Sequence, residues 1–324
     1  MLSNHTITGI GSALVDVLIN DTDQFLKKFN KKKGGMTYVT AQEQQAIISA
    51  SSQVPVIVPG GAACNTILGV GMLGGSARFI GARGKDDYGD IFESEVRKCG
   101  VEPVLSCFDT PTGKVLSVVT PDAQRSMFTD LGASGLMDPA AVTDQLFSDT
   151  AIALVEGYLL FNRDLIMAAL KAAKGAGALV ALDLASFEVV NASKDILQDL
   201  VTAYVDILIA NEDEAQAYTG ESDEKTALEK LSDNVTYAVL KVGSRGSYVH
   251  HDNTVTRIEP VAGNPPVDTT GAGDLWAAGF LYGIANNLSI EKSGQLGSMC
   301  GYEVCQVMGA QIPGPIWEKI KATI

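Results

Sequence analysis

Short continuous apolar runs and longer stretches of helical spacing alternate along the chain. The runs predict buried strands at residues 5–11, 54–58, 77–81, 151–155, 178–183 and 206–210. Helical spacing lies between most of these runs, at residues 62–73, 88–98, 163–174 and 212–218. Because repetition of strand, helix and strand builds a parallel sheet with helices on both faces, the pattern predicts an α/β fold.

Two regions depart from this pattern. Their residues alternate in a β-like way without crossover helices, at residues 14–19 with 36–40, and at residues 104–108 with 113–130. The turn-forming stretch DTPTG separates the last two segments. We interpret both regions as a small, discontinuous β-sheet lid, formed by about residues 14–40 and 104–130.

The last part of the chain, from Asp274 onward, is predicted to be helical. Three stretches with helical spacing follow one another, at residues 275–288, 289–310 and 315–324. Neither an internal repeat nor a low-complexity linker divides the chain. We therefore expect residues 1–324 to form a single domain, an α/β body that carries the lid.

Composition narrows the class of protein. The 324 residues are 46% hydrophobic, which supports a substantial core and excludes a disordered or fibrous chain. The formal net charge of -14 disfavours binding to nucleic acid or to an anionic membrane. No basic leader precedes an apolar segment, and no apolar run approaches the roughly 18 residues of a membrane span. We expect a soluble, cytoplasmic protein.

Cysteine and histidine usage excludes further chemistry. The five cysteines are an odd number without a C-x-x-C pair, so neither a disulfide framework nor a zinc site is expected. The three histidines are too few and too badly spaced for a metal cluster or a Ser-His-Asp triad. Any catalysis is expected to depend on other side chains.

The stretch VDTTGAGDLWAAGF, residues 267–280, sets a glycine turn against an aspartate where a helical pattern begins. The glycines leave the N–H groups of Gly271 to Asp274 free to face one point, and the helix adds the positive end of its dipole. A phosphate would be bound favourably there. Asp274 could then accept the proton of an attacking hydroxyl, because phosphoryl transfer needs positioning more than a strong base. The alternative is a simple helix cap.

Two motifs far apart in the chain carry a resemblance to a known family. The residues DTTGAGD end at Asp274, and PGGAACN supplies the paired glycines Gly60 and Gly61 with a downstream Asn65. Together they resemble the ribokinase-like family of sugar and nucleoside kinases, the phosphofructokinase-B type. The resemblance covers nearly the whole chain. It implies a ribokinase-like three-layer α/β/α body with a mostly parallel central sheet and a small lid.

The resemblance implies roles for the glycine turn. Asp274 is similar to the family's catalytic base, which deprotonates the acceptor hydroxyl. The anion hole for the transferred phosphate is implied at Gly271, Ala272 and Gly273. In several relatives the positions of Asp268 and Thr270 help to bind a monovalent cation, so the resemblance leaves a potassium requirement open.

Further motifs indicate a site for ATP and Mg²⁺. Asn211 and Glu214 match the family's N-x-x-E motif and follow an apolar strand, at the edge where α/β sheets bind ligands. The resemblance implies that they act on the metal and the phosphates through water. Taken alone, they could be an acidic helix start. The loop with Lys241, Gly243 and Gly246 corresponds to one that lies against the nucleotide, although alone it is a glycine-containing hairpin.

The acceptor site is implied near the amino terminus. Asp16 matches the family's sugar-clamping aspartate, and a carboxylate can accept hydrogen bonds from two neighbouring hydroxyls. Gly61 would let the backbone approach the sugar, with Gly60 beside it, and Asn65 would add a polar contact.

Two stretches, GSALVD at 11–16 and TPDAQRSMFTDLGA at 120–133, resemble the adenosine-kinase branch more closely than the ribokinase branch. The resemblance implies that Leu14 and Met127 face a base and that Arg125 lies near the phosphates. Ser12 departs from the branch, which usually has asparagine there. Other nucleosides and free sugars therefore stay open as acceptors.

Two alternatives to a nucleoside kinase remain. One is a sugar kinase of the ribokinase or fructokinase type, and the other is a catalytically silent nucleotide-binding protein on the same fold. A dehydrogenase is suggested only by G-x-G-x-x-G at 69–74, which closes a predicted helix instead of opening one. Relatives either cap their own site with the lid or share lids in a dimer, so both a monomer and a homodimer fit the sequence.

Overall fold

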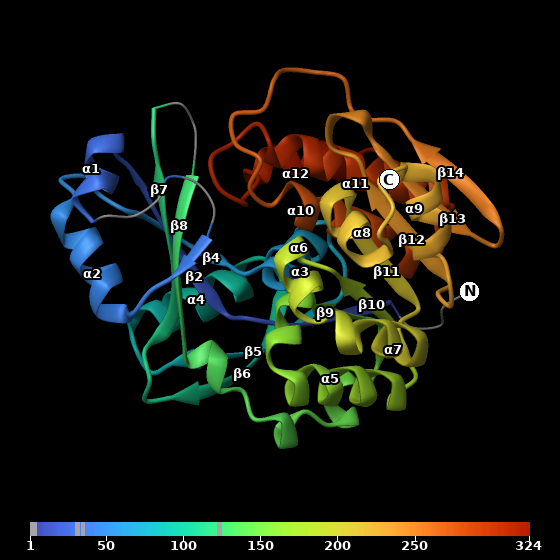
Figure 1. Ribbon diagram of the computed structural model, residues 1–324, viewed down its shortest axis with the longest axis horizontal. Coiled ribbons are helices and arrows are strands. Elements are labelled where there is room, and N and C mark those ends of the chain that lie inside the picture. Colours follow the sequence, from blue (N-terminus) through green and yellow to red (C-terminus); the bar gives the residue numbers. More distant parts are fainter. Residues whose placement is uncertain (1–4, 30–32, 34–35, 122–124) are drawn as a thin grey trace.

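The computed structural model describes residues 5–29, 33, 36–121 and 125–324 (Figure 1). The body of the molecule is built on a nine-stranded sheet, here called the large sheet. All neighbouring strands in it run parallel except the two pairs at one edge, β12 with β13 and β13 with β14, which are antiparallel. In sheet order the strands are β14 (Thr254–Ile258), β13 (Ser247–His251), β12 (Tyr237–Lys241), β11 (Ile207–Asn211), β10 (Leu179–Asp183), β9 (Thr150–Glu156), β1 (Thr6–Ile10), β5 (Ala77–Gly84) and β6 (Val101–Phe108).

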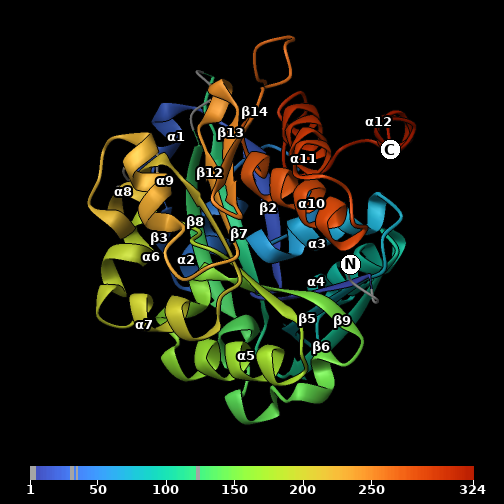
Figure 2. The same cartoon turned by 90° about the vertical axis from the view of Figure 1, so that its right-hand side faces the viewer.

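Helices cover both faces of the large sheet (Figure 2). One face packs against α3 (Ala62–Met72), α4 (Asp87–Lys98), α10 (Ala272–Ala285), α11 (Ile290–Val304) and α12 (Gly314–Lys321). The other face packs against α5 (Arg163–Gly175), α6 (Phe187–Ala192), α7 (Lys194–Tyr204), α8 (Glu212–Thr219) and α9 (Glu224–Leu231). Because side chains alternate along a strand, Leu154 of β9 enters the first core and Val155 enters the second. The three-layer α/β prediction is confirmed.

Short 3-10 helices connect several of these elements. They are η1 (Ala133–Leu136), η2 (Pro139–Ala141), η3 (Asp144–Phe147), η4 (Gly157–Phe161) and η5 (Gly243–Arg245). None of the described helices has both the length and the apolar character that crossing a membrane requires.

A second, five-stranded sheet stands beside the body, here called the small sheet. Its strands in order are β3 (Met36–Tyr38), β8 (Arg125–Gly132), β7 (Thr112–Val119), β2 (Leu14–Asn20) and β4 (Val56–Gly60). The outer face carries α1 (Asp23–Lys28) and α2 (Ala41–Ala50). Buried Gln44 of α2 fastens the helix to the sheet, because its Nε2 donates to the carbonyl oxygens of Lys114 and Phe128 at 2.9 and 2.8 Å.

Two strand assignments made from the sequence are wrong. Residues 54–58, predicted as a buried strand of the body, contribute to β4, which pairs with β2 in the small sheet and leaves Val56 59% exposed. Residues 104–108, predicted as part of the lid, lie in β6, which pairs with β5 at the edge of the large sheet. Both segments are short and strand-like, and hydrophobic period alone does not say which sheet such a segment joins.

The glycine fingerprint at 69–74 lies where the sequence predicted, at the end of a helix. Gly69 and Gly71 belong to α3, and Gly74 follows it with a φ of +88°. A Cβ on Gly69 would lie 2.7 Å from the Cβ of Ala278 in α10. Close helix packing therefore explains Gly69 and the left-handed end of the helix explains Gly74, so these glycines do not form a dinucleotide turn.

Candidate functional site

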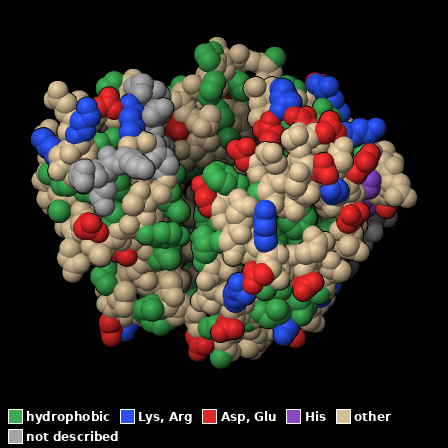
Figure 3. All heavy atoms as spheres, in the orientation of Figure 1, with side chains coloured by type: hydrophobic (Ala, Val, Ile, Leu, Met, Phe, Trp, Pro, Cys, Tyr) green, Lys and Arg blue, Asp and Glu red, His purple; other side chains and the backbone are tan. Residues whose placement is uncertain are grey.

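The structure has two large cavities, and Figure 3 shows a hollow between the small sheet and the body. The first, here called the inter-sheet cavity, has a volume of about 550 Å³ and is bordered by both sheets. The second, here called the C-terminal cavity, has a volume of about 730 Å³ and is bordered by the end of β12 and by α10 and α11. A small central hollow lies beside them, lined by Glu156, Asp183 and Asp274 among others. Glu156 also lines the inter-sheet cavity.

The glycine turn forms part of the wall of the C-terminal cavity. Gly271 precedes α10 in the left-handed conformation, with a φ of +74° and no side-chain cap. A Cβ at this position would approach the Cβ of Ala310 to 2.7 Å. The first N–H groups of α10, including those of Gly273 and Asp274, have no partner within the helix. The turn therefore leaves backbone N–H groups available to an anion, and its role as a phosphate site stays a prediction.

Asp274 does not cap its helix. Its Oδ2 accepts a hydrogen bond of 2.9 Å from Nδ2 of Asn65 in α3, so the two family motifs meet in space. Burial raises the pKa of Asp274 to about 7; the Asn65 hydrogen bond and the charge of Lys241 oppose the rise, and Asp183 adds to it. At neutral pH this carboxylate is therefore poised to accept or to hold a proton.

Lys241 brings a positive charge to the glycine turn. Its Nζ would lie 3.1 Å from a Cβ on Gly273, so the ammonium group occupies the space beside that glycine. Nζ also donates a 3.0 Å hydrogen bond to Oδ2 of Asp183. Burial lowers the pKa of Lys241, but the carboxylates of Asp183, Glu214 and Asp274 outweigh it, and the pKa lies above its usual value. The lysine is therefore a largely buried cation, with 13% of its side chain exposed.

Asn211 and Glu214 bind each other at the start of α8. Glu214 Oε2 accepts from the Asn211 backbone N–H at 2.8 Å, and its Oε1 accepts from Asn211 Nδ2 at 2.7 Å. Asn211 Oδ1 in turn accepts from the Glu214 N–H, which completes a capping box. Burial and nearby Asp183 raise the pKa of Glu214 to about 7. The helix-start interpretation therefore holds locally, and any ligand contact of Glu214 would have to coexist with these bonds.

Glu156, at the end of β9, is a buried carboxylate that the sequence reasoning missed. Its oxygens accept hydrogen bonds from the backbone N–H groups of Ser12 and Ala63. A Cβ on Gly11 would lie 2.4 Å from Oε2, so that glycine makes room for the carboxylate. Burial raises its pKa to about 7 despite these donors. An acidic residue directly after a buried strand was the available signal, because such positions point to the ligand edge of the sheet.

Asp16 lies on the inner face of the small sheet and lines the inter-sheet cavity. Its carboxylate lies against Gly60, where a Cβ would approach Cγ of Asp16 to 2.5 Å. Gly61 has a φ of +99°, and a Cβ there would lie 2.3 Å from the carbonyl oxygen of Ser12. Both glycines of the pair are therefore required by space, and Gly61 also by conformation.

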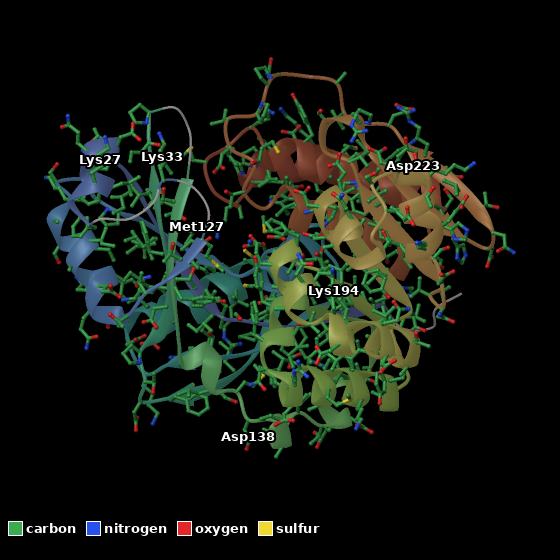
Figure 4. The ribbon with its side chains drawn as sticks, viewed as in Figure 1. Lys27, Lys33, Met127, Asp138, Lys194 and Asp223 are labelled. Atoms are coloured by element: carbon green, nitrogen blue, oxygen red, sulfur yellow. The ribbon has the colours of Figure 1, made fainter. Side chains whose placement is uncertain are left out.

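Apolar side chains line the rest of the inter-sheet cavity. Leu14 and Met127 both border it, and Figure 4 marks Met127 on β8 of the small sheet. That they face a base stays a prediction. Aromatic residues that were not predicted join them from both sides, namely Tyr38, Tyr158 and Phe161. The backbone of Arg125 belongs to β8, but its side chain lies outside the described residues.

The other predicted residues lie around the C-terminal cavity. Gly243 and Gly246 line it, and both have positive φ. Asp268 Oδ1 accepts from the N–H and the hydroxyl of Thr270, at 3.0 and 2.9 Å, and Oδ2 accepts from the Gly309 N–H at 2.8 Å. These bonds brace the chain that leads into the glycine turn. Within the part of the chain that is described, no three His, Cys, Asp or Glu residues are grouped to hold a metal ion.

Comparisons with known proteins bear on the family and the fold of this chain. The family model described as "pfkB family carbohydrate kinase" matches residues 20–317 of this chain. The adenosine kinase of Saccharomyces cerevisiae is 27% identical, over 94% of this chain and 96% of the yeast protein.

Two solved structures have the same fold over their whole length. The adenosine kinase of Sinorhizobium meliloti has a TM-score of 0.90 at 30% identity, covering 99% of this chain and 100% of that one. A probable sugar kinase of Rhizobium etli has a TM-score of 0.90 at 29% identity, with 100% and 99% covered. The protein thus has the ribokinase-like fold, and it belongs to the pfkB family of carbohydrate kinases.

Proposed function

We propose that the protein transfers the terminal phosphoryl group of ATP to a primary hydroxyl of a ribose-containing nucleoside, with adenosine as the first candidate. The observation that carries this proposal is the position of Asp274. It follows the anion-binding turn of one cavity and lines the central hollow together with Glu156, which also lines the other cavity. A base at that junction can take a proton from a hydroxyl in one cavity while a phosphate is bound in the other.

ATP is proposed to occupy the C-terminal cavity. A volume of about 730 Å³ lies within the range of small-molecule sites. The N–H groups at Gly271, Ala272 and Gly273 would bind the transferred phosphate as an anion hole. Lys241, Gly243 and Gly246 would line the rest of the nucleotide site.

Mg²⁺ is proposed to bind with the nucleotide. Both oxygens of Glu214 already accept hydrogen bonds from Asn211, so this pair fits an outer role, through water on the metal. When bound, the metal supplies positive charge to the phosphates. Asp268 and Thr270 would hold the loop beside the turn, where a monovalent cation such as potassium is an additional proposal.

The acceptor is proposed to bind in the inter-sheet cavity. Asp16 would accept hydrogen bonds from two ribose hydroxyls, and Gly60 and Gly61 would let the sugar approach the backbone. Ser12 and Asn65 would add polar contacts. A base would lie between the apolar side chains of Leu14 and Met127, and Arg125 is proposed to lie near the phosphates.

A free sugar is the second candidate acceptor, and a specific observation favours it. Glu156 brings a second carboxylate to the cavity that contains Asp16, and paired carboxylates suit a ligand with many hydroxyl groups. The likeness to a probable sugar kinase of Rhizobium etli points in the same direction.

The test measures ATP consumption with wild-type protein across a panel of nucleosides and free sugars. We expect adenosine to give the highest kcat/KM, and the Asp274→Asn variant to lower kcat by about 100-fold to 10,000-fold, the range for loss of a general base. Calorimetric titration of ATP should give similar affinities for both proteins. A free sugar that outperforms every nucleoside would replace the acceptor assignment. Absence of transfer to every acceptor, with ATP still bound, would instead identify a silent nucleotide-binding protein.

A further inference from the structure

We propose that Lys241 contacts the phosphoryl group during its transfer, and that Asp183 is the positioning residue that holds the Lys241 ammonium at the glycine turn. This inference rests on the proposed phosphoryl transfer at Asp274. Asp183 belongs to none of the motifs that suggested the site.

The ammonium group of Lys241 lies where a transferred phosphate would be bound. Lys241 ends β12 and lines the C-terminal cavity together with Ala272 and Gly273. Its Nζ would lie only 3.1 Å from a Cβ on Gly273, so any side chain at that position would press against the cation. The glycine therefore provides backbone N–H donors and also leaves room for the cation beside them.

Asp183 is held so that one oxygen faces Lys241. Its Oδ1 accepts a 3.1 Å hydrogen bond from the Ala185 N–H, and its Oδ2 accepts from Lys241 Nζ at 3.0 Å. Ala185 has a φ of +65°, which is uncommon for a residue other than glycine. A strained turn at the end of β10 thus fixes the orientation of the carboxylate, and such strain is concentrated at functional sites.

Negative charge predominates around the pair of Lys241 and Asp183. Buried Glu156 and Glu214 lie near Asp183, together with Asp274, and the charge of Asp183 raises the pKa of all three of these carboxyl groups. Among the described residues lining the C-terminal cavity and the central hollow, Lys241 is the one cation. A phosphate arriving among these carboxylates would be repelled without it. A cation fixed beforehand stabilises the transition state without the cost of reorganisation.

The pair also lies on the path between the cavities. Asp183 shares the central hollow with Asp274, and Lys241 reaches from there into the C-terminal cavity. In the transfer, the bond between the terminal phosphorus and the bridging oxygen of ATP breaks, while the acceptor oxygen forms a bond to that phosphorus. The hydroxyl proton passes to Asp274, and ADP leaves with the bridging oxygen. Lys241 stays charged throughout and takes no proton.

The experiment compares wild-type protein with Lys241→Met, Asp183→Asn and the double variant carrying both changes. We expect Lys241→Met to lower kcat by about 100-fold to 1,000-fold, the usual effect of removing one oxyanion donor, and Asp183→Asn by about tenfold or more. The KM of the acceptor should stay within about threefold, because neither residue lines the inter-sheet cavity. The double variant leaves no unpaired charge from this ion pair, so it should fold even if a single variant does not. Its kcat should be as low as that of Lys241→Met.

A second ion pair offers a matched control. Lys174 Nζ lies 2.7 Å from Asp206 on the surface, away from both cavities. Lys174→Met makes the same chemical change as Lys241→Met, and it should leave kcat within about twofold of wild type.

The pH profile separates this role from general structural damage. Lys241 lowers the pKa of Asp274 and Asp183 raises it; Asn65 and Glu156 also act on this pKa, and the titratable groups of Cys64 and Tyr158 lie near enough to feel the charge of Asp274. The acid limb of kcat should therefore move to higher pH in Lys241→Met and to lower pH in Asp183→Asn. A shift in the same direction, or a kcat within threefold of wild type in the double variant, overturns the inference. Wild-type protein that transfers phosphate to no acceptor overturns the proposed function instead.

Discussion

The two cavities are built in different ways from the same chain. Among the residues that the structure describes, the C-terminal cavity is bordered only by ones between Lys241 and Gln306, all belonging to the body. The inter-sheet cavity draws on both sheets, with Ser12 and Asp16 at one end of the chain and Leu165 far along it. A local motif can therefore describe the first cavity, whereas the shape of the second depends on how two sheets pack.

The cavities also differ in the ligand chemistry that they offer. The C-terminal cavity has glycine N–H groups and one lysine, which favour an anion. The inter-sheet cavity has the carboxylates of Asp16 and Glu156 among apolar and aromatic walls, which favour a ligand with hydroxyl groups and an apolar face. This division of charge fits the proposal that a polyanion and a neutral acceptor bind on either side of Asp274.

Removing the Asp16 carboxylate should give the largest difference between the two cavities in ligand affinity. We expect Asp16→Ala to weaken acceptor binding by about 10-fold to 150-fold, because a charged hydrogen-bond partner of the sugar is lost in a buried site. ATP affinity should change by less than about twofold. Isothermal titration of each ligand separately measures both effects.

The control for this change lies on the same small sheet. Asp23 in α1 pairs with Lys33 at 2.7 Å on the surface, so Asp23→Ala removes an equivalent carboxylate without touching the cavity. Equal losses of acceptor and ATP affinity in Asp16→Ala would show that the cavities are not independent.

As pH rises, ionisation of Asp274 between the cavities should increase activity and decrease stability. Because the pKa of Asp274 is about 7 and the base must be ionised, kcat should rise by about tenfold per pH unit below 7 and level off above it. Between its ordinary pKa of 3.8 and 7, the folded protein binds more protons at Asp274 than the unfolded chain. The free energy of unfolding contributed by this group therefore falls as pH rises.

Denaturant unfolding at pH 5 and pH 8 checks the sign. Relative to wild type, Asp274→Asn should be more stable at pH 8 than at pH 5, because asparagine removes the cost of a buried charge. A difference that is the same at both pH values would contradict the raised pKa.

A substitution at Met127 should have a smaller effect, which distinguishes the base of the acceptor from its ribose. Met127→Glu places a charge against the proposed base, so we expect the ratio of kcat/KM for adenosine to that for ribose to fall by about fivefold or more. The kcat/KM for ribose itself should be spared, and Met127→Leu should keep the wild-type ratio. An unchanged ratio in Met127→Glu would show that the base of the nucleoside does not lie against Met127.

Much of the body could be predicted from the sequence because its signals are local. Helical spacing located α3 and α5 to within about a residue, and the glycine turn before Asp274 has the conformation that its composition requires. The pairing of strands was harder. Segments 54–58 and 104–108 exchanged their expected sheets, because strand partners are chosen by contacts across the chain and not by period.

The charged groups of the site show the same limit. Asp274 and Glu214 were found through motifs, but Asp183 and Glu156 stand alone at strand ends without a motif around them. Their importance follows from neighbours brought by folding, such as Lys241 for Asp183 and the Ala63 N–H for Glu156. The position after a buried strand was a signal for both, but it does not identify the partner.

The small sheet has a consequence for how acceptor preference can evolve. Its strands come from two separate parts of the chain, since β2, β3 and β4 are divided from the β7–β8 hairpin by α3, β5, α4 and β6 of the body. No single exchange of one contiguous segment could therefore transplant the whole acceptor surface from a related protein. New substrates would have to be acquired by substitutions in place, and Met127, Thr129 and Leu131, which alternate along one strand and line the cavity, are neighbouring positions where such changes can accumulate.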